Sequence, residues 1–528
     1  MKKRMLTLLL AAGLLVSMLA GCGGGNTESG SDIGSVSAGS GSGEKALVWG
    51  DTTFNAENGE PDINPHRDNS GWACIRYGVG ETLFRFSDSM EIEPWLAKSY
   101  ENTDELTWVI QLREDVDFAS GRHMDAQSVK ECLEDLISVH VRAAEDLQIR
   151  EITAEGYTLT IHTAEPVPAL IHYLADPYGC VIDMEAGVTE EGIVSGTGPY
   201  QAVSLVTDSG LELVKNENYW GGEPKLDKVT VRTITDGDTL TMALQSGEID
   251  VAYGMPYASY PLFENEQYSF TSCATSRAFF GTMNFESPVT GDPAVRKAIA
   301  LGIDKEGFVE TLLGGNGYPA EGVFPENFIF GGDAVSTETY DPEEAEKVLE
   351  EAGWIDTDGD GIREKEGTLL TLRWLTYPSR QELPLLAEYA QSTLGEIGFQ
   401  VEINSTADHN SIRTDPSAWD IYVSAMVTAP TGDPEYFFTY RCLDSSANND
   451  GHYHSDELEN LAEEMSRTFD SARRQELAVE MQQVILKDNA FVFASHLRMS
   501  MVADASVTGL TAHPCDYYEI TADLDIGG

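Results

Sequence analysis

Residues 473–495, RRQELAVEMQQVILKDNAFVFAS, place a helix pattern directly before a strand pattern and decide the fold class. Four apolar side chains recur at the spacing of one buried helix stripe: Leu477, Met481, Val484 and Ile485. The run Phe491–Ser495 that follows is apolar and has the composition of a strand. A strand that returns after the last long helix is expected of a chain that crosses into a second lobe and comes back.

The same alternation of strand and helix patterns extends through the rest of the chain. Strand-like runs of aromatic, β-branched and other apolar residues occur at Thr107–Arg113, Tyr157–His162, Val229–Ile234, Leu369–Leu375 and Trp419–Ser424. Helix-like patterns occur at Pro384–Leu394, Leu458–Thr468 and Arg473–Lys487. Strands that are interleaved with helices predict an α/β architecture.

The N-terminus has the parts of a secretory signal in their usual order. A basic segment, KKR at positions 2–4, precedes the apolar run Met5–Ala20, whose 16 residues are fewer than the ~20 that span a membrane. The run ends at Leu-Ala-Gly-Cys, which resembles the bacterial lipoprotein signal and implies that residues 1–21 are removed and Cys22 is lipidated. The alternative is an ordinary secreted protein with a cysteine at its cleavage site by chance.

Residues 22–43 comprise Cys22 and a segment, GGGNTESGSDIGSVSAGSGSG, that cannot build a core and is expected to be a flexible Gly/Ser tether. A cysteine that carries two or more acyl chains anchors a protein stably. The protein is therefore expected outside the cytoplasm, attached to the membrane through its N-terminal lipid.

Charge and size narrow the function classes. The formal charge of −55 repels phosphate backbones and anionic head groups, so nucleic acid and direct lipid binding are excluded as main functions. The about 485 residues after the tether are too many for one simple core, so two or more lobes are expected.

Six cysteines remain besides Cys22: Cys74, Cys132, Cys180, Cys273, Cys442 and Cys515. They are widely spaced and form no Cys-x-x-Cys pair, so the spacing typical of a zinc site is absent. Export permits disulfides, but a body of this size does not depend on them. Free, buried thiols are therefore expected.

Short motifs follow one another in a recognisable order over most of the chain. They are Gly80–Phe86, Ile92–Tyr100, Leu106–Phe118, Met124–Val129, Gly196–Tyr200, Asn218–Gly222, Ala243–Asp250, Val295–Ile299, Gly302–Lys305 and Asp341–Ala345. A single motif of this kind would indicate only a turn or a strand. The ordered set resembles the peptide- and nickel-binding family of ABC solute-binding proteins, bacterial solute-binding protein family 5.

The resemblance implies a two-lobed, type II periplasmic-binding-protein-like fold, in which two α/β lobes close over a ligand cleft as a hinge. Lobe I is expected at 44–275, with an extra subdomain at about 65–190, and lobe II at 276–490. The segment 491–528 is expected to return to lobe I. The resemblance also implies an ABC permease and an ATPase as partners, and a monomer is expected.

The family divides between peptide binders and binders of nickel chelates. Peptide binders anchor the α-amine of the ligand with an acidic residue just before a Gly-Asp-Pro-like turn. Here that turn lies in Val427–Phe438, and Pro430 occupies the acidic position. Because proline cannot pair with an ammonium group, the sequence favours nickel or another metal chelate as the ligand, with a di- or oligopeptide as the alternative.

The nickel branch holds an anionic chelator with arginines, whose planar guanidinium suits carboxylates. The resemblance places Arg142 at one arginine position, Tyr178 at the second, and Ser446 near the position of a metal-binding histidine, five residues after Arg441. Because Tyr178 and Ser446 depart from the pattern, a direct bond between protein and metal is in doubt. Arg142 and Arg441 could each equally bridge local carboxylates.

Trp72 and Arg76 follow Ile63–His66 and are expected to approach the cleft. A core aromatic is the equal alternative for Trp72.

An acidic loop carries Asp356, Asp358 and Asp360 at positions 1, 3 and 5 of a sequence that resembles a calcium loop. Gly367 stands where the closing glutamate belongs. A tight acidic hairpin turn is therefore favoured over a calcium site.

The sequence contains none of the Gly-x-x-x-x-Gly-Lys-Ser/Thr, His-Glu-x-x-His or Gly-x-Ser-x-Gly motifs. No enzyme activity and no cofactor are therefore expected. Two other classes stay open, a ligand sensor built on the same binding fold and a secreted hydrolase.

Overall fold

The computed structural model describes residues 44–55, 62–67 and 70–527, and Glu44–Gly528 forms one compact unit. The signal segment, Cys22 and the tether lie outside the described residues. Helices and strands alternate through the described chain, so the predicted α/β class is confirmed. None of the described helices is both long enough and apolar enough to cross a membrane.

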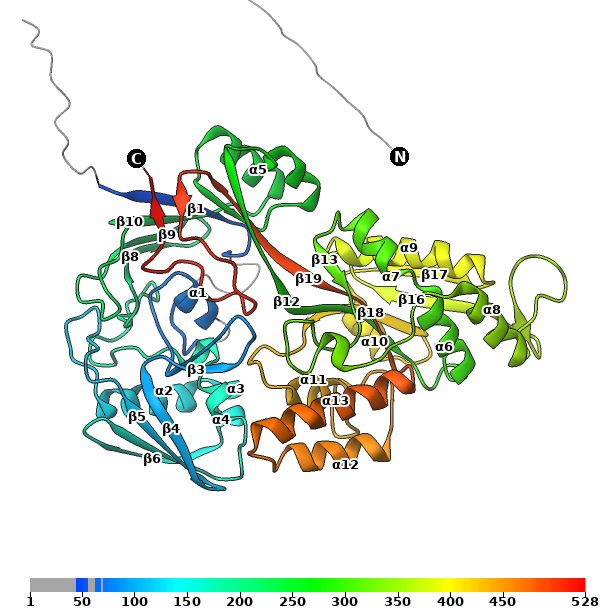
Figure 1. Cartoon of the computed structure of the whole chain (residues 1–528), viewed down its shortest axis with the longest axis horizontal. Coiled ribbons are helices and arrows are strands. Elements are labelled where there is room, and N and C mark those ends of the chain that lie inside the picture. The colour runs from blue at the N-terminus through cyan, green and yellow to red at the C-terminus, as the bar shows by residue number, and fades with distance from the viewer. Residues whose placement is uncertain (1–43, 56–61, 68–69, 528) are drawn as a thin grey trace, which may run out of the picture. The chain divides into compact units, whose positions relative to one another are not determined.

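One mixed sheet of eleven strands runs through the compact unit (Figure 1). Its strand order is β17-β16-β18-β12-β19-β11-β1-β10-β9-β8, and β13 pairs with β19 beside this path. The strands are β1 (Ala46–Asp51), β8 (Tyr200–Val206), β9 (Gly210–Lys215), β10 (Lys228–Thr233), β11 (Val251–Tyr253), β12 (Tyr268–Met283), β13 (Gly317–Pro319), β16 (Thr371–Thr376), β17 (Gln400–Ser405), β18 (Ile421–Val427) and β19 (Phe491–Asp504).

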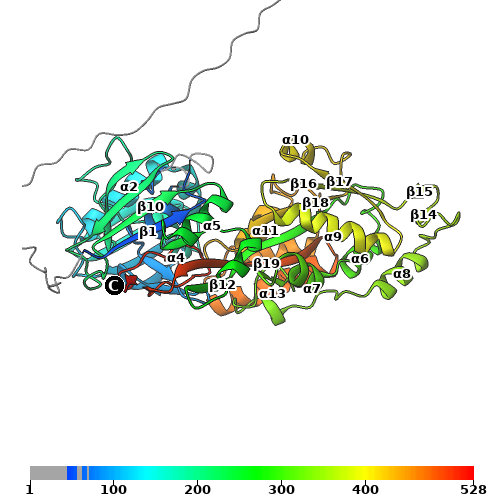
Figure 2. The same cartoon turned by 90° about the horizontal axis from the view of Figure 1, so that it is seen from above.

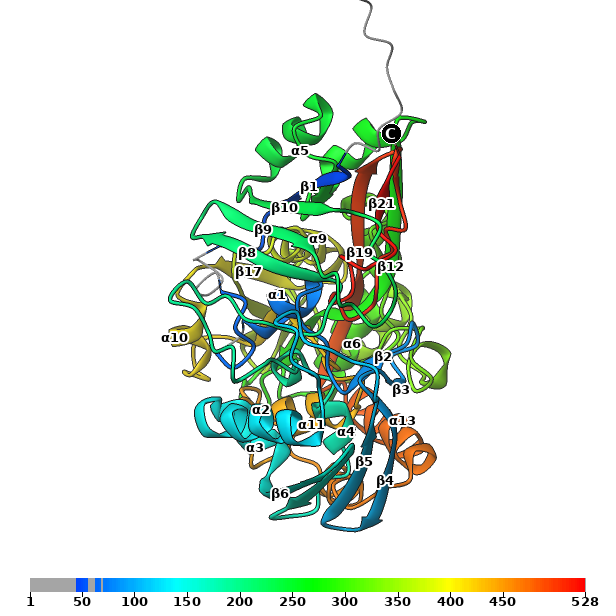
Figure 3. The same ribbon diagram turned by 90° about the vertical axis from the view of Figure 1, so that its left-hand side faces the viewer.

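Two long antiparallel strands, β12 and β19, connect the two halves of this sheet (Figures 1 and 3). On the side of β12 away from β19, pairing with β18 begins at Arg277. The chain therefore passes from one half of the sheet to the other on β12 and comes back on β19. The strand predicted at Phe491–Ser495 is confirmed as the start of β19.

The half that contains β16, β17 and β18 has parallel pairing. β16 pairs in parallel with both β17 and β18, so the carboxyl ends of the three strands lie at one edge. Helix α9 (Glu382–Glu396), which confirms the helix predicted at Pro384–Leu394, connects β16 to β17. Helix α10 (His409–Arg413) follows β17 and lies beside the same strands (Figure 2). In open α/β sheets, ligands bind outside such carboxyl ends.

A separate four-stranded antiparallel sheet has the order β4-β5-β7-β6. In β5, inward residues such as Trp108 and Ile110 alternate with more exposed ones, as expected when one face of a sheet is covered. Helix α2 begins at Asp125, whose side chain forms a capping box with Ser128. The elements are β4 (Ala97–Asp104), β5 (Thr107–Leu112), α2 (Ala126–Val139), α3 (Val141–Leu147), β6 (Ile149–Glu155) and β7 (Thr158–Thr163).

Helix α13 (Ser471–Lys487) confirms the helix expected before the last long strand, and the four residues of its predicted stripe are all buried. The remaining helices and strands are α1 (Gly71–Arg76), β2 (Phe84–Phe86), β3 (Ile92–Pro94), α4 (Leu170–Tyr173), η2 (Pro177–Gly179), α5 (Gly237–Ser246), η3 (Tyr257–Phe263), α6 (Pro293–Gly302), α7 (Lys305–Gly307), η4 (Phe308–Leu312), η5 (Gly332–Ala334), α8 (Pro342–Glu351), β14 (Glu364–Lys365), β15 (Thr368–Leu369), α11 (Glu435–Arg441), α12 (Asp456–Met465), β20 (Val507–Thr508) and β21 (Asp525–Ile526).

The largest cluster of buried apolar side chains contains residues of the four-stranded sheet and residues of α13 and the eleven-stranded sheet. Leu112 and Ile161 of the small sheet belong to it, and so do Ile485 of α13 and Phe493 of β19. The six cysteines that follow Cys22 are free in the structure. Four of them are buried as expected, whereas Cys273 and Cys515 are half-buried.

Candidate ligand-binding site

A β-bulge interrupts β12 where this strand passes between the two halves of the sheet. Ala274 faces Arg498 and Ala278 faces His496, so the three residues between them on β12 stand opposite a single residue of β19. A bulge of this kind bends a strand and re-aims side chains, and bulges are common beside functional sites. Here it changes the direction of Arg277.

Backbone and hydroxyl contacts hold the bulge in place. The Thr275 hydroxyl donates to the Leu497 carbonyl at 2.9 Å. The Ser276 carbonyl accepts hydrogen bonds from the Thr428 backbone N–H at 2.8 Å and from the Thr428 hydroxyl at 3.1 Å. The bulge is therefore tied directly to the loop that follows β18.

Arg277 is half-buried, and its guanidinium makes no hydrogen bond or ion pair with any residue that the structure describes. Burial lowers the pKa of this guanidinium, and the positive charge of Arg380 lowers it further, while Asp516 and Tyr253 act in the opposite direction. A charge that is removed from water without a partner costs several kcal/mol. A bound anion would therefore stabilise the Arg277 guanidinium.

Arg380 follows β16 at the carboxyl-end edge of the parallel strands. It is exposed, and its guanidinium also makes no hydrogen bond or ion pair within the described part of the chain. Tyr377 lies in the same connection, and its hydroxyl accepts from the Ala425 N–H of β18 at 3.2 Å. The imidazole of His409 stacks on Tyr377 with ring centroids 4.2 Å apart. This edge therefore combines unpaired cations with aromatic faces.

In the loop after β18, the resemblance places Pro430 where peptide binders have an acid. The next acid, Asp433, is buried and accepts three hydrogen bonds from the Arg474 guanidinium, at 2.7 to 3.1 Å. Arg474 lowers the pKa of Asp433, although burial acts in the opposite direction. This carboxylate is already paired inside the protein. It does not replace the missing acid at Pro430.

The same loop touches the other half of the molecule. The His172 ring of α4 contacts the Thr431 carbonyl at 2.8 Å through Nδ1. Gly432 adopts a φ of 67° and approaches the Met90 carbonyl so closely that a Cβ atom would lie 2.4 Å from it. A glycine is therefore required where the two halves meet.

Arg142, a predicted ligand-binding residue, is paired by the protein. Its guanidinium donates to both Asp176 oxygens, at 2.9 and 2.8 Å, and stacks over Tyr178 at 4.7 Å. The Tyr178 ring is buried, and its hydroxyl donates to Asp146 at 3.2 Å. The structure thus shows the local carboxylate bridge that the sequence left as the alternative to a ligand contact.

The guanidinium of Arg76 is also paired with other residues of the protein. It is buried, donates to Asp516 at 2.6 Å and lies 3.7 Å from Asp51. Its guanidinium stacks over Trp72 at 4.4 Å and over Tyr253 at 4.5 Å. Asp516 and Tyr253 also raise the pKa of Arg277, so the Arg76 cluster lies near Arg277.

Arg441 and Ser446 lie together in and after α11. Arg441 is buried and donates to Asp450 at 3.1 Å, but its Nε has no partner among the described residues. The half-buried Ser446 donates from its hydroxyl to the Tyr440 carbonyl at 2.5 Å. Tyr440 in turn stacks on Tyr436 with ring centroids 5.5 Å apart.

The structure thus brings some predicted residues together and adds others. Tyr436 is close enough to Arg142 and Arg441 for both cations to lower its pKa, although burial raises that pKa overall. The sequence did not indicate Arg277 or Arg380. The available signal was a charged residue inside the strand pattern that precedes Ala-Phe-Phe, since an arginine in a buried strand needs a partner.

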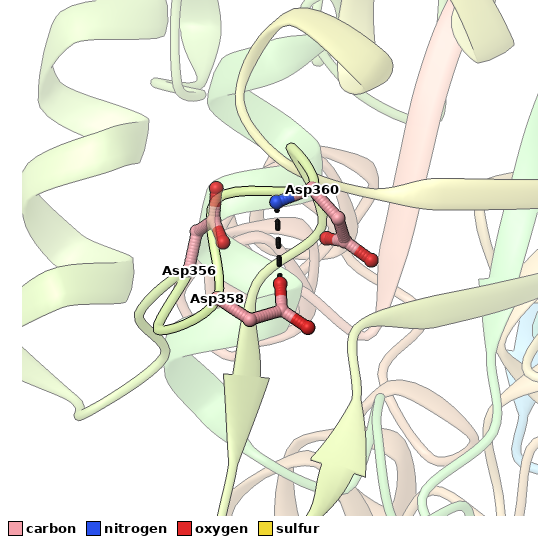
Figure 4. A group of neighbouring side chains, drawn as sticks. All are labelled: Asp356, Asp358 and Asp360. Carbon is pink, nitrogen blue, oxygen red and sulfur yellow. Dashed lines mark hydrogen bonds between the residues drawn. The ribbon is translucent and has the colours of Figure 1, made fainter.

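The acidic loop after α8 is shown in Figure 4. Its carboxylate oxygens, one each from Asp356, Asp358 and Asp360, lie within 4.8 Å of one another, and all three residues are exposed. Asp356 accepts from the N–H groups of Gly359 and Gly361 at 2.7 and 3.0 Å, and Asp358 accepts from the Asp360 N–H at 3.2 Å. The carboxylates thus close a tight turn, which the sequence favoured over a calcium site.

Comparison with known proteins supplies the family. Residues 91–449 match the model of the bacterial extracellular solute-binding proteins, family 5 Middle. The nickel-binding protein NikA of Staphylococcus aureus is 27% identical over 446 residues, which cover 84% of this chain and 89% of that protein.

Comparison with solved structures agrees with this family match. A nickel ABC transporter from Bacillus halodurans superposes with a TM-score of 0.81 at 33% sequence identity, and the match covers 92% of this chain and 100% of that one. The oligopeptide-binding protein AppA from Bacillus subtilis, in complex with a nonapeptide, has a TM-score of 0.69 at 19% identity, with coverage of 92% and 100%, and shares the fold alone.

These likenesses confirm the two-lobed, type II α/β fold. Members of the matching family are extracytoplasmic, bind small solutes, and work with ABC permease and ATPase components. This chain belongs to the bacterial extracellular solute-binding proteins of family 5.

Proposed function

We propose that this protein captures an anionic metal chelate, with nickel as the favoured metal, and delivers it to the permease of an ABC importer. The observation that carries the proposal is the unpaired Arg277–Arg380 pair at the carboxyl ends of the parallel strands. Two guanidinium groups without protein partners suit the carboxylates of a chelator, which can take two parallel hydrogen bonds from each.

Support for nickel comes from the relatives. The S. aureus relative is a nickel-binding protein, and the B. halodurans structure is a nickel ABC transporter. In the proposed binding mode the chelator carries the metal, and Arg277 and Arg380 bind the carboxylates of the chelator. Tyr377, Tyr436 and Tyr440 pack against the rings of the chelator. Closure of the two lobes on β12 and β19 then produces the form that the permease receives.

The architecture proposed around this site is a monomer anchored by lipid on Cys22 and tethered through residues 22–43. Lobe I is assigned to 44–275, with its extra subdomain at about 65–190. Lobe II is assigned to 276–490, and 491–528 returns to lobe I. The crossing of the chain on β12 and its return on β19 support these boundaries.

A peptide ligand is the second candidate, because the peptide-binding protein AppA shares the fold. Two observations weigh against it. Pro430 replaces the acid that would hold the α-amine, and Asp433 is engaged by Arg474. A peptide would therefore bind without a carboxylate partner for its ammonium group at this loop.

Isothermal titration calorimetry of the purified mature protein tests the proposal. The probes are nickel with excess histidine, nickel alone, histidine alone and a tetrapeptide. The nickel–histidine complex is expected to bind more tightly than the other three. Arg277→Ala should weaken that binding by about 2 kcal/mol, roughly 30-fold, since it removes a buried charge-assisted contact.

Arg150→Ala is the matched control, because Arg150 is an exposed arginine of the small sheet. It should leave the affinity unchanged. Tighter binding of the tetrapeptide than of the nickel complex would transfer the assignment to the peptide branch. An unchanged affinity in Arg277→Ala would remove this arginine from the site.

A further inference from the structure

Two cysteines of the first half of the molecule are neighbours in its core. Cys74 lies in α1, Cys180 directly follows η2, and both side chains are fully buried. The two elements pack backbone against backbone, since a Cβ atom on Gly71 would lie 2.6 Å from the carbonyl of Pro177. Cys74 and Cys180 are thus held at one contact between segments that are far apart in the chain.

Gly80 shows how close the two sulfur atoms are. A Cβ atom on Gly80 would lie 2.6 Å from Cys74 Sγ, 3.3 Å from Cys180 Sγ and 3.1 Å from Cys180 Cβ. The separation of the two sulfur atoms therefore cannot exceed the sum of the first two distances. Gly80 leaves room for both thiols, and a larger residue there would displace them.

The third cysteine of this region has different partners. Cys132 Sγ accepts from the Ile182 N–H at 3.4 Å, lies 3.5 Å from His66 Nε2 and donates to the Cys180 carbonyl at 3.7 Å. Its sulfur is thus committed to polar groups. Burial raises the pKa of Cys180 most, and the neighbouring Cys74 thiol raises it further, so these two thiols lie close to each other.

We propose that Cys74 and Cys180 become joined by a disulfide as the exported chain folds. The proposal rests on family membership, which places the protein outside the cytoplasm where disulfides persist, and it does not depend on the ligand. The disulfide would connect α1, which carries Trp72 and Arg76, to the segment that carries Tyr178.

The oxidant in this step is a small or protein disulfide. One cysteine thiolate attacks the oxidant disulfide and forms a mixed disulfide, and one oxidant thiol leaves. The second cysteine then attacks the protein sulfur of that mixed disulfide and releases the other oxidant thiol. The two protein thiols lose two electrons and two protons, and the oxidant becomes two thiols.

Burial determines when this reaction occurs. In the folded chain both thiols are inaccessible, and burial raises the pKa of Cys180 well above its usual value, so little thiolate forms there. The oxidation is therefore expected while the chain folds, before α1 packs on η2.

Refolding of the full chain tests the pairing. The protein is unfolded and reduced, refolded with oxidised glutathione, alkylated and digested without reductant for mass spectrometry. The expected product is a peptide pair joined through Cys74 and Cys180 that is lighter by two hydrogens, while Cys442, another buried cysteine, is fully alkylated. Complete alkylation of Cys74 and Cys180, or a Cys74–Cys132 link, would overturn the proposal.

A stability measurement gives a second readout. Reductant added during refolding should lower the midpoint of thermal unfolding of the wild-type protein by roughly 3 to 5 °C, because the cross-link closes a long loop. The same reductant should leave Cys180→Ala unchanged, whereas Cys442→Ala should keep the full sensitivity. A wild-type midpoint that does not respond to reductant would contradict the disulfide.

Discussion

Two groups of arginines meet where the two halves of the molecule come together, and they differ in pairing. Arg76 and Arg142 lie in the first half, and both donate to nearby carboxylates. Arg277 and Arg380 lie on the bulged strand and after β16, and neither is paired within the described residues. The difference separates arginines that are paired within the protein from the two that we propose bind the ligand.

Loss of Arg76, a buried arginine that pairs with three acids, should have the largest effect on stability. Arg76→Met leaves the buried Asp51 and the neighbouring Asp516 and Glu519 without their cation. We expect the free energy of unfolding to fall by about 3 to 5 kcal/mol, because the remaining carboxylates become unpaired buried charges. Urea unfolding followed by circular dichroism measures this, with Arg150→Met as the surface control. A loss below about 1 kcal/mol would show that Arg76 is not the cation that holds this cluster.

The contrast between paired and unpaired charges can also be tested with a buried carboxylate that has no paired cation. Glu81 is fully buried and accepts from the Thr197 and Tyr219 hydroxyls and the Trp220 indole N–H. Burial raises its pKa from 4.5 to about 7, although the three donors act in the opposite direction.

The sign of the pH dependence follows from that shift. Between pH 4.5 and about 7 the folded state keeps the Glu81 proton that the unfolded state has lost, so stability falls as pH rises. The slope due to this group is up to about 1.4 kcal/mol per pH unit. Urea unfolding over this range should show that slope reduced in Glu81→Gln and retained in Glu93→Gln. A Glu81→Gln variant with the wild-type slope would assign the pH dependence to other groups.

Removal of an unpaired arginine should not cost stability. We expect Arg277→Ala to unfold at the same or a higher urea concentration than the wild type, with a gain of up to about 1 kcal/mol, because it removes an uncompensated charge. The measurement is made without ligand. If this variant instead lost stability as Arg76→Met does, Arg277 would be part of the structural framework.

The smallest effect on ligand binding is expected at Arg142, where pairing and ligand binding were both open. Because Asp176 already takes two of its hydrogen bonds, Arg142→Ala should weaken chelate binding by less than about 1 kcal/mol. It should lower stability by about 1 to 3 kcal/mol, because the buried Asp176 loses its partner. Calorimetry with the nickel–histidine probe decides this. An affinity loss as large as that of Arg277→Ala would return Arg142 to the site.

Sequence patterns predicted the fold well because local periodicity reports local burial. The stripe on α13 is buried as expected, and the strand at Phe491–Ser495 forms the start of β19. The site was harder to predict. Arg142 and Arg76 are typical ligand-binding residues by type, but their carboxylate partners come from other elements, and no local pattern indicates such a pairing.

The sequence by itself determined the α/β class, the helix and strand that end the second half, and the family, because these depend on periodicity and on ordered motifs. The tertiary structure alone decided which arginines are free. That outcome depends on a bulge opposite Leu497 and on carboxylates such as Asp176 and Asp516 that pack against Arg142 and Arg76 from distant parts of the chain. A charge is paired or unpaired only by its neighbours in space, and chain order does not reveal them.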